Sequence, residues 1–245
     1  MPRKIQPVRA FAIVAITACS SIAYAYILPA DAILSSVSKR RSKIALKSLV
    51  IEGTLEVGTD APHPVWEVLV PGKAHRVEHK LQDKTIVQTT VGARRWTQTL
   101  GQAAERAKIV TDDPFMTFLG AANSDPGGKR GLAFCDRLKI DTSVVSLSRL
   151  DKRVAFVIGA KPWEANKPQL WIDKILRVPV RLVTVDGSGN VVDQQLHGFG
   201  SAVTGEWYPR TYERYDNGTL TQRVVYDEVQ VNVPVEPQLL EPPTS

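Results

Sequence analysis

The sequence predicts an α+β protein built mainly from antiparallel β-strands, and three observations support this. Residues 154–233 consist of short runs of β-branched and aromatic residues separated by Gly, Asn, Asp or Pro, which is typical of strands joined by tight turns. Residues 186–190 and the pair Asn217-Gly218 are turn sequences, and Asn-Gly suits a type I′ hairpin because both central residues need a positive φ. Helical patterns occupy only the region before residue 48 and the middle of the chain.

Short motifs follow one another in a characteristic order through the last third of the chain. They are VIGA at 157–160, LWIDK at 170–174, VPVRL at 178–182, GEWYPRTYE at 205–213 and NG at 217–218. This order resembles the C-terminal half of the outer-membrane lipoprotein-sorting, or LolA/LolB-like, proteins. The resemblance implies a strongly curved, half-open β-barrel with a few helices filling or capping its mouth. It also implies a non-enzymatic function in which acyl chains of a lipid or lipoprotein bind inside the barrel.

Length and composition are consistent with an N-terminal signal peptide followed by one folded domain. We expect a signal peptide at 1–25, one domain over 31–233 and a loose Pro-rich tail over 234–245. The 245 residues are 43% hydrophobic and 23% charged, which is ordinary for a globular protein. The formal net charge of +6 includes the leader residues Arg3, Lys4 and Arg9. Because the remaining surplus is mild, nucleic acid is not an expected partner.

The first 25 residues predict export to the periplasm. A basic segment up to Arg9 precedes an apolar run over 10–18, which is the pattern of a secretory signal peptide. Cleavage after Ala23-Tyr24-Ala25 would release a soluble protein. Alternatively, Ile16-Thr17-Ala18-Cys19 resembles a lipobox, and lipidation of Cys19 would anchor the protein to a membrane. A soluble protein can carry cargo, whereas an anchored one would receive it.

The N-terminal half predicts one helix and then a series of hairpins. Residues 31–47 have helical spacing, with Asp31 as the expected N-cap. The basic residues 39–41 are interpreted as a solvated helix face, with contact to lipid phosphates or to an acidic partner as the alternative. Period-two alternation then predicts strands at 49–57, 66–70, 74–81, 85–91 and 94–97. The third of these strands has His75 and His79 on one face.

The middle of the chain predicts helices beside a polar loop. Residues 101–108 are helix-prone, and 111–122 begin with an acidic cap and Pro114 before an apolar segment. Residues 123–131 read as a Gly-rich loop. An apolar helix beside such a loop suits a lid over a cavity, and permanent core packing is the alternative. Residues 141–150 are ambiguous between helix and strand.

The chain lacks the sequence motifs of common enzymes. It contains no Gly-x-Ser-x-Gly elbow, no Walker loop and no dinucleotide-binding glycine pattern. Cys135 follows an apolar run and is expected to be a buried small residue. On a strand, His75 and His79 would lie about 13 Å apart, too far to share one ion. We therefore expect no catalysis, no cofactor and no metal site.

The resulting hypothesis is an exported, non-enzymatic binding protein of the cell envelope. The first alternative is an envelope sensor or assembly module that binds a partner protein with the same fold, and the second is a hydrolase with a dispersed site. We selected the residues expected to line the acyl site from alternation within each strand and from the predicted lid. They are Leu49, Ile51, Leu55, Trp66, Val68, Val70, Trp96, Phe115, Phe118, Leu119, Phe156, Ile158, Leu170, Ile172, Leu182 and Tyr208.

Overall fold

The computed structural model describes residues 27–43, 46–81, 84–92, 94–101, 105–107, 128–206 and 208–241. Strands make up most of this part of the chain, as the alternation in the sequence predicts. The strands are β1 (Leu49–Val57), β2 (His63–Val70), β3 (Ala74–Leu81), β4 (Lys84–Val91), β5 (Arg94–Thr99), β6 (Glu105–Ala107), β7 (Val145–Leu150), β8 (Arg153–Ile158), β9 (Gln169–Asp173), β10 (Pro179–Val185), β11 (Val191–His197), β12 (Thr211–Asp216) and β13 (Thr219–Val231).

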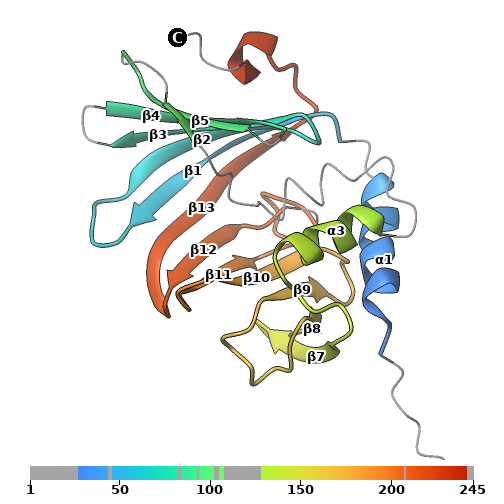
Figure 1. The fold of residues 1–245 in the computed structure, drawn as a ribbon. Helices are drawn as coiled ribbons and strands as arrows, with labels where there is room; N and C mark the ends of the chain where they lie inside the picture. The colour runs from blue at the N-terminus through green and yellow to red at the C-terminus, as the bar shows by residue number, and fades with distance from the viewer. Residues whose placement is uncertain are drawn as a thin grey trace, which may run out of the picture.

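All of these strands belong to one antiparallel sheet of 13 strands that does not close. The spatial order is β6-β5-β4-β3-β2-β1-β13-β12-β11-β10-β9-β8-β7. Two meanders, β1–β6 and β7–β13, therefore meet where the first strand pairs with the last. The sheet curves around the helices α1 (Ala30–Ser42) and α3 (Lys129–Arg137) (Figure 1). The predicted class, a curved half-open barrel with few helices, is confirmed.

The junction between the two meanders depends on Gly53. The β1–β13 ladder changes register between Glu52 and Gly53, which marks a β-bulge. A Cβ atom at Gly53 would lie 2.4 Å from the carbonyl oxygen of Val225, closer than any side chain tolerates. Glycine therefore lets the two backbones approach and lets the long strand β13 bend with the curve of the sheet.

Both described α-helices pack against the β7–β10 end of the sheet. The buried side chains of α1 recur every three or four residues, at Ala30, Ile33, Leu34 and Val37, so they form one helical stripe. This stripe joins Phe134 and Cys135 of α3 in a cluster with sheet residues. Cys135 is free and buried, and burial raises the pKa of its thiol to about 12, as suits an inert core residue.

The structure differs from the helix predictions in four places. Helix α1 begins after Pro29, so Asp31 lies inside the first turn, where its charge suits the helix dipole, and is not the N-cap. The helix ends at Ser42 instead of 47. Residues 129–131, predicted as loop, form the first turn of α3. Residues 105–107, predicted as helix, pair with β5 because edge pairing in the sheet outweighs local helix propensity.

Other predictions have clear outcomes. The Asn217-Gly218 turn is confirmed, with φ values of 50° and 82°. The ambiguous segment 141–150 ends in strand β7. The tail is not loose throughout, because the 3₁₀ turn η2 (Pro237–Leu240) lies against β3 and β4, and Arg76 Nη1 donates to Leu239 O at 3.3 Å. The leader, including Cys19, and the predicted helix 111–122 lie outside the described residues.

Candidate functional site

The face of the sheet that packs against α1 and α3 is called the concave face, and the opposite face the convex face. Residues directly opposite each other on neighbouring strands share a face. The register thus places Leu55, Val224, Tyr212 and Leu196 in one row across β1, β13, β12 and β11. A second row runs from Gln194 of β11 through Leu182 and Leu170 to Ile158. Leu196 and Gln194 are two residues apart, so both rows lie on the same face.

At its β7–β10 end, the concave face is a filled core. The buried side chains that β8, β9 and β10 contribute to the cluster with α1 and α3 are each at most 3% exposed. Five of the residues predicted to line an acyl site lie in this cluster, so the described helices already cover them. They are Phe156, Ile158, Leu170, Ile172 and Leu182.

At its β1–β2–β13 end, the concave face holds another group of the predicted residues. Leu49, Ile51, Leu55 and Tyr208 belong to a second buried cluster. The rings of Tyr208 and Tyr226 meet edge to face with centroids 5.2 Å apart. This cluster also contains concave-face residues that the sequence prediction missed, namely Val65, Leu69, Val224 and Tyr226.

Four predicted residues lie on the convex face. Trp66 sits opposite Glu52 and Glu78, and Val68 sits opposite Arg76, whereas the concave side of β2 carries Val65, Glu67 and Leu69. Alternation could not resolve this face because apolar residues occupy both sides of β2. Val70 and Trp96 share the convex face with Trp66 and Val68. Phe115, Phe118 and Leu119 lie outside the described residues.

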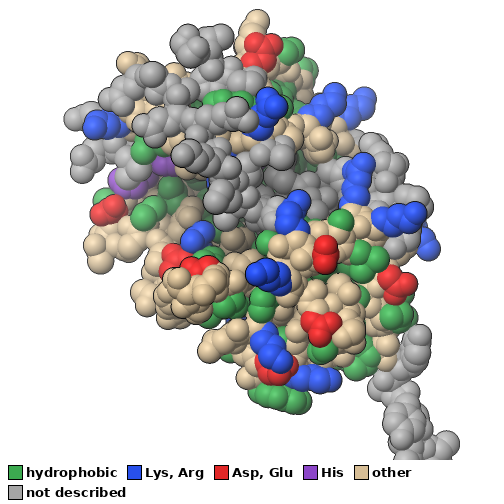
Figure 2. All heavy atoms as spheres, viewed as in Figure 1, with side chains coloured by type: hydrophobic (Ala, Val, Ile, Leu, Met, Phe, Trp, Pro, Cys, Tyr) green, Lys and Arg blue, Asp and Glu red, His purple; other side chains and the backbone are tan. Residues whose placement is uncertain are grey.

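Polar side chains interrupt the concave face on β2 and β3. Glu67 is only 5% exposed, and its Oε2 lies 3.0 Å from His75 Nε2. Burial lowers the pKa of His79, and the charge of nearby His63 lowers it further. His63 Nε2 is buried without a hydrogen-bond partner. Figure 2 shows histidine side chains grouped with hydrophobic ones in the upper-left part of the molecule, near the position of β2 and β3 in Figure 1.

These histidines do not form a metal centre. Within the described ranges, no group of three His, Cys, Asp or Glu residues is arranged to hold a metal ion. The arrangement is an apolar cluster with a few buried polar groups, a composition that sites for apolar ligands with a polar end share. The buried apolar side chains that β1, β2 and β13 contribute to it are at most 6% exposed, so they are about as buried as those at the β7–β10 end. Among the described helices, none is both long and apolar enough to span a bilayer.

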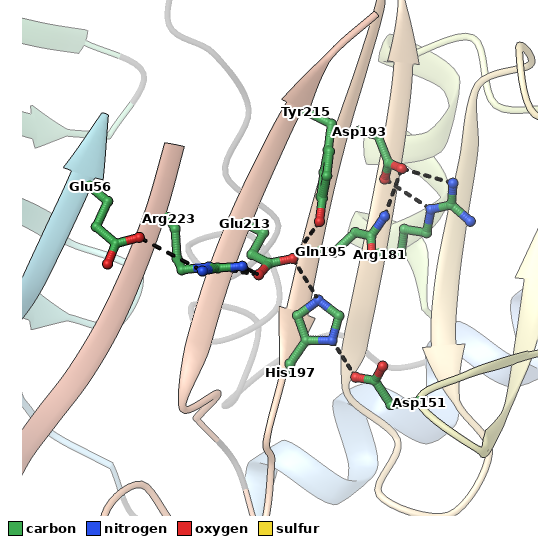
Figure 3. Close-up of polar contacts among 9 residues, drawn as sticks. All are labelled: Glu56, Asp151, Arg181, Asp193, Gln195, His197, Glu213, Tyr215 and Arg223. Atoms are coloured by element: carbon green, nitrogen blue, oxygen red, sulfur yellow. Dashed lines mark hydrogen bonds and ion pairs between the residues drawn. The ribbon is translucent and has the colours of Figure 1, made fainter. Parts of the chain in front are cut away.

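The convex face of β10–β13 carries a network of paired charges (Figure 3). Arg181 binds Asp193 through two hydrogen bonds of 2.9 and 2.8 Å. Arg223 and Tyr215 both donate to Glu213, at 2.9 and 2.6 Å. Burial raises the pKa of Glu213, but these hydrogen bonds and the nearby positive charges outweigh it, so the pKa lies below its ordinary value. The protein therefore supplies the counter-charges of this face itself.

A small cavity of about 230 Å³ lies beside this network. His197 is at its edge, with Nδ1 bonded to Asp151 and Nε2 3.5 Å from Glu213 Oε2. The described lining contains no Ser, Thr or Cys, and the hydroxyl residue opposite His197 on the neighbouring strand is Thr211. The lining residues are Leu150, Asp151, Arg153, Ala155, Asp173, Val180, Leu196, His197, Gly198 and Phe199.

Solved structures share the half-open antiparallel barrel with helices against its concave face. The chain matches no protein-family model and no curated protein by sequence. In structure it is similar to a LolA superfamily protein from Nitrosomonas europaea (TM-score 0.50, 12% identity, 88% of this chain and 99% of that one). It is also similar to a putative outer membrane lipoprotein-sorting protein domain from Vibrio parahaemolyticus (TM-score 0.50, 12% identity, 84% of this chain and 93% of that one).

A DUF1329 family protein from Desulfovibrio piger is similar to the same extent, with a TM-score of 0.53 and 10% identity over 88% of this chain and 98% of that one. At these identities the likeness concerns the fold. The chain has a LolA-like fold, as the order of motifs in its last third predicts, and the resemblance is confirmed at that level.

Proposed function

We propose that this protein is an exported, non-enzymatic binding protein of the cell envelope that holds acyl chains of a lipid or lipoprotein. The supporting observation is the apolar row Leu55–Val224–Tyr212–Leu196 on the concave face, together with a separate pair on the same face, Leu49 of β1 opposite Leu69 of β2. Burial of a methylene group contributes ~0.8 kcal/mol, so a ten-carbon chain gains about 8 kcal/mol. Useful affinity therefore needs no special motif.

The two ends of the concave face have different roles in this proposal. The β7–β10 end is stabilised by α1 and α3 and acts as the rigid support. The β1–β2–β13 end, whose apolar side chains are also buried in this structure, is the proposed container, and there the apolar row lies beside Glu67 and the histidines. Of the predicted residues in the described part of the chain, Leu49, Ile51, Leu55 and Tyr208 are retained as ligand contacts.

Export is part of the proposal. Residues 1–25 would direct the chain through the secretory pathway and leave a soluble periplasmic protein, while lipidation at Cys19 would leave an anchored one that contacts the membrane. A carrier releases its cargo at another site and therefore must be soluble. A receptor that stays at the membrane must be the anchored form.

The test is mass spectrometry of the protein exported with its own leader, performed under native conditions and after organic extraction. A chain beginning at Tyr26, together with co-purifying acyl lipid, is the expected result. A diacylglyceryl adduct on Cys19 with bound lipid would make the protein an anchored receptor. A mature chain without lipid, which also takes up none when lipid is offered, would contradict acyl binding and favour the partner-binding module.

A further inference from the structure

Arg41 is a buried cation with no hydrogen-bond partner in the part of the chain that the structure describes. It continues the buried stripe of α1, one turn after Val37, and its side chain is 1% exposed. None of its three guanidinium nitrogens is bonded to a described residue. The preceding residue, Arg40, behaves differently: it is exposed and forms an ion pair with Glu206 at 2.7 Å. Only one of these two adjacent arginines is therefore satisfied by the protein.

An unpaired buried guanidinium is costly to the fold. Burial, with a contribution from Arg40, lowers the pKa of Arg41 to about 9, which still leaves the side chain charged at neutral pH. Native proteins pair buried charges because a charge without a partner loses its hydration and gains nothing in return. An anionic group beside the guanidinium would offset this cost.

The position of Arg41 connects it to the apolar site. Val37, about 6 Å before it along the helix, packs in the filled cluster at the β7–β10 end. Leu46, shortly after it in the chain, packs against the second cluster, which contains Leu49 and Leu55. Along the chain, Arg41 therefore lies between a residue of the first cluster and a residue that packs against the second. A ligand with its chain in the container can reach the guanidinium with its polar end.

The chemistry of the side chain selects the ligand group. A guanidinium presents five N–H donors in a planar fork that matches a carboxylate or a phosphate. We propose that Arg41 binds the anionic group of an acyl ligand, so that the protein takes anionic amphiphiles in preference to neutral ones. This inference rests on the proposed function, because it assigns the head group of the ligand whose chain occupies the concave face.

The test compares three probes by titration calorimetry on the exported protein: dodecyl phosphate, dodecanol and inorganic phosphate. Dodecyl phosphate should bind at least about tenfold more tightly than dodecanol, since hydrogen bonds to a charged group have that effect on affinity. Arg41→Met keeps the apolar stem and should abolish this preference while leaving the dodecanol affinity within about twofold. Arg40→Met changes the net charge equally and should leave the preference intact.

The possible outcomes distinguish a failure of the role proposed for Arg41 from a failure of the proposed acyl binding. Equal binding of dodecyl phosphate and dodecanol to the native protein would overturn the role of Arg41 and leave acyl binding standing. Binding of neither probe would contradict the proposed function itself. Inorganic phosphate that binds as tightly as dodecyl phosphate would show a free-anion site and overturn the amphiphile proposal.

Folding of the variant is measured in parallel. Arg41→Met should raise the melting temperature of the ligand-free protein by at least about 3 °C, because an unpaired buried charge is removed. If this variant fails to fold, Arg41→Lys keeps the charge and loses the fork, and it should reduce the preference for dodecyl phosphate. An unchanged preference in Arg41→Lys together with a lower melting temperature in Arg41→Met would identify a structural residue and overturn the proposal.

Discussion

The convex face of β10–β13 and the buried groups on the helix side of the molecule differ in how their polar groups are paired. On the convex face of β10–β13, Arg181 binds Asp193, and Arg223 binds Glu213. On the helix side, Arg41 and His63 Nε2 are buried without a hydrogen-bond partner among the described residues. The convex network pairs its arginines within the protein, although His197 Nε2 at its edge is likewise buried without a hydrogen-bond partner. The helix side differs in that its unpaired group is a whole charged guanidinium, which an anionic ligand group could pair with.

The largest expected effect comes from adjacent valines on β13. Val224 faces the concave side opposite Leu55, and Val225 faces the convex side opposite Thr54. Val224→Asp should lower the free energy of unfolding by about 4 kcal/mol, because the carboxylate would be buried among apolar side chains. Val225→Asp should cost less than about 1.5 kcal/mol. Urea denaturation measures both, and equal costs would remove the distinction between the faces.

The convex network should matter for stability and not for binding. Glu213→Gln should cost about 1–2 kcal/mol at pH 7, because two hydrogen bonds to a charged group are weakened. The folded-state pKa of Glu213 lies below its ordinary value, so its contribution is present above that value and lost as pH falls through the folded pKa. Unfolding at pH 7 and pH 3 should therefore show a shrinking difference from the native protein. A loss of lipid binding in this variant would indicate that the ligand binds the convex face, which would contradict the proposal.

A nearly isosteric pair tests binding without disturbing the fold. Val224→Thr adds one hydroxyl to the concave face, and Val225→Thr adds it to the convex face. The first should weaken dodecyl phosphate binding by about fivefold, because a polar group then faces the acyl chain, and the second by less than about twofold. Calorimetric titration of both variants provides the comparison. The reverse order of effects would place the chain on the convex side.

The smallest expected effect concerns pH and the concave histidines. The pKa of His79 is lowered, so on acidification the unfolded chain takes up this proton first. The resulting loss of stability begins near the ordinary histidine pKa of about 6.5 and continues down to the folded value. His79→Gln should flatten the change in stability between pH 7.5 and 5.5 by somewhat less than about 1 kcal/mol. An unaltered pH dependence, measured by urea denaturation, would show that His79 is not in this buried state.

Much of the fold follows from local patterns in the sequence. Alternation and turn residues predicted the strand from 49 to 57, the strand from 74 to 81 and the Asn217-Gly218 hairpin, because each depends on near neighbours. Helix α3 was missed because it begins directly after Gly128, which has a φ of 71°, inside a Gly-rich stretch that indicates a loop. The strand at 105–107 exists only through its pairing with β5.

The site was harder to predict, because it depends on which side chains meet. Strand β2 is apolar on both faces, so Trp66 and Val68 were not separable from Val65 and Leu69 by alternation. Strand β9 is buried throughout its length and carries no periodic signal. The basic run ending in Arg41 predicts a solvated helix face, and only the packing of α1 on the sheet shows that one of its members is buried.

The central claim is that acyl chains occupy the concave face at its β1–β2–β13 end. A dodecyl phosphate that carries a photoreactive diazirine at its chain end tests this directly, with the labelled positions identified by peptide mass spectrometry. The account predicts labels on concave residues such as Leu55 and Val224, which disappear when unlabelled dodecyl phosphate is added in excess. Labels confined to convex residues such as Val225, or labelling that excess ligand does not suppress, would contradict it.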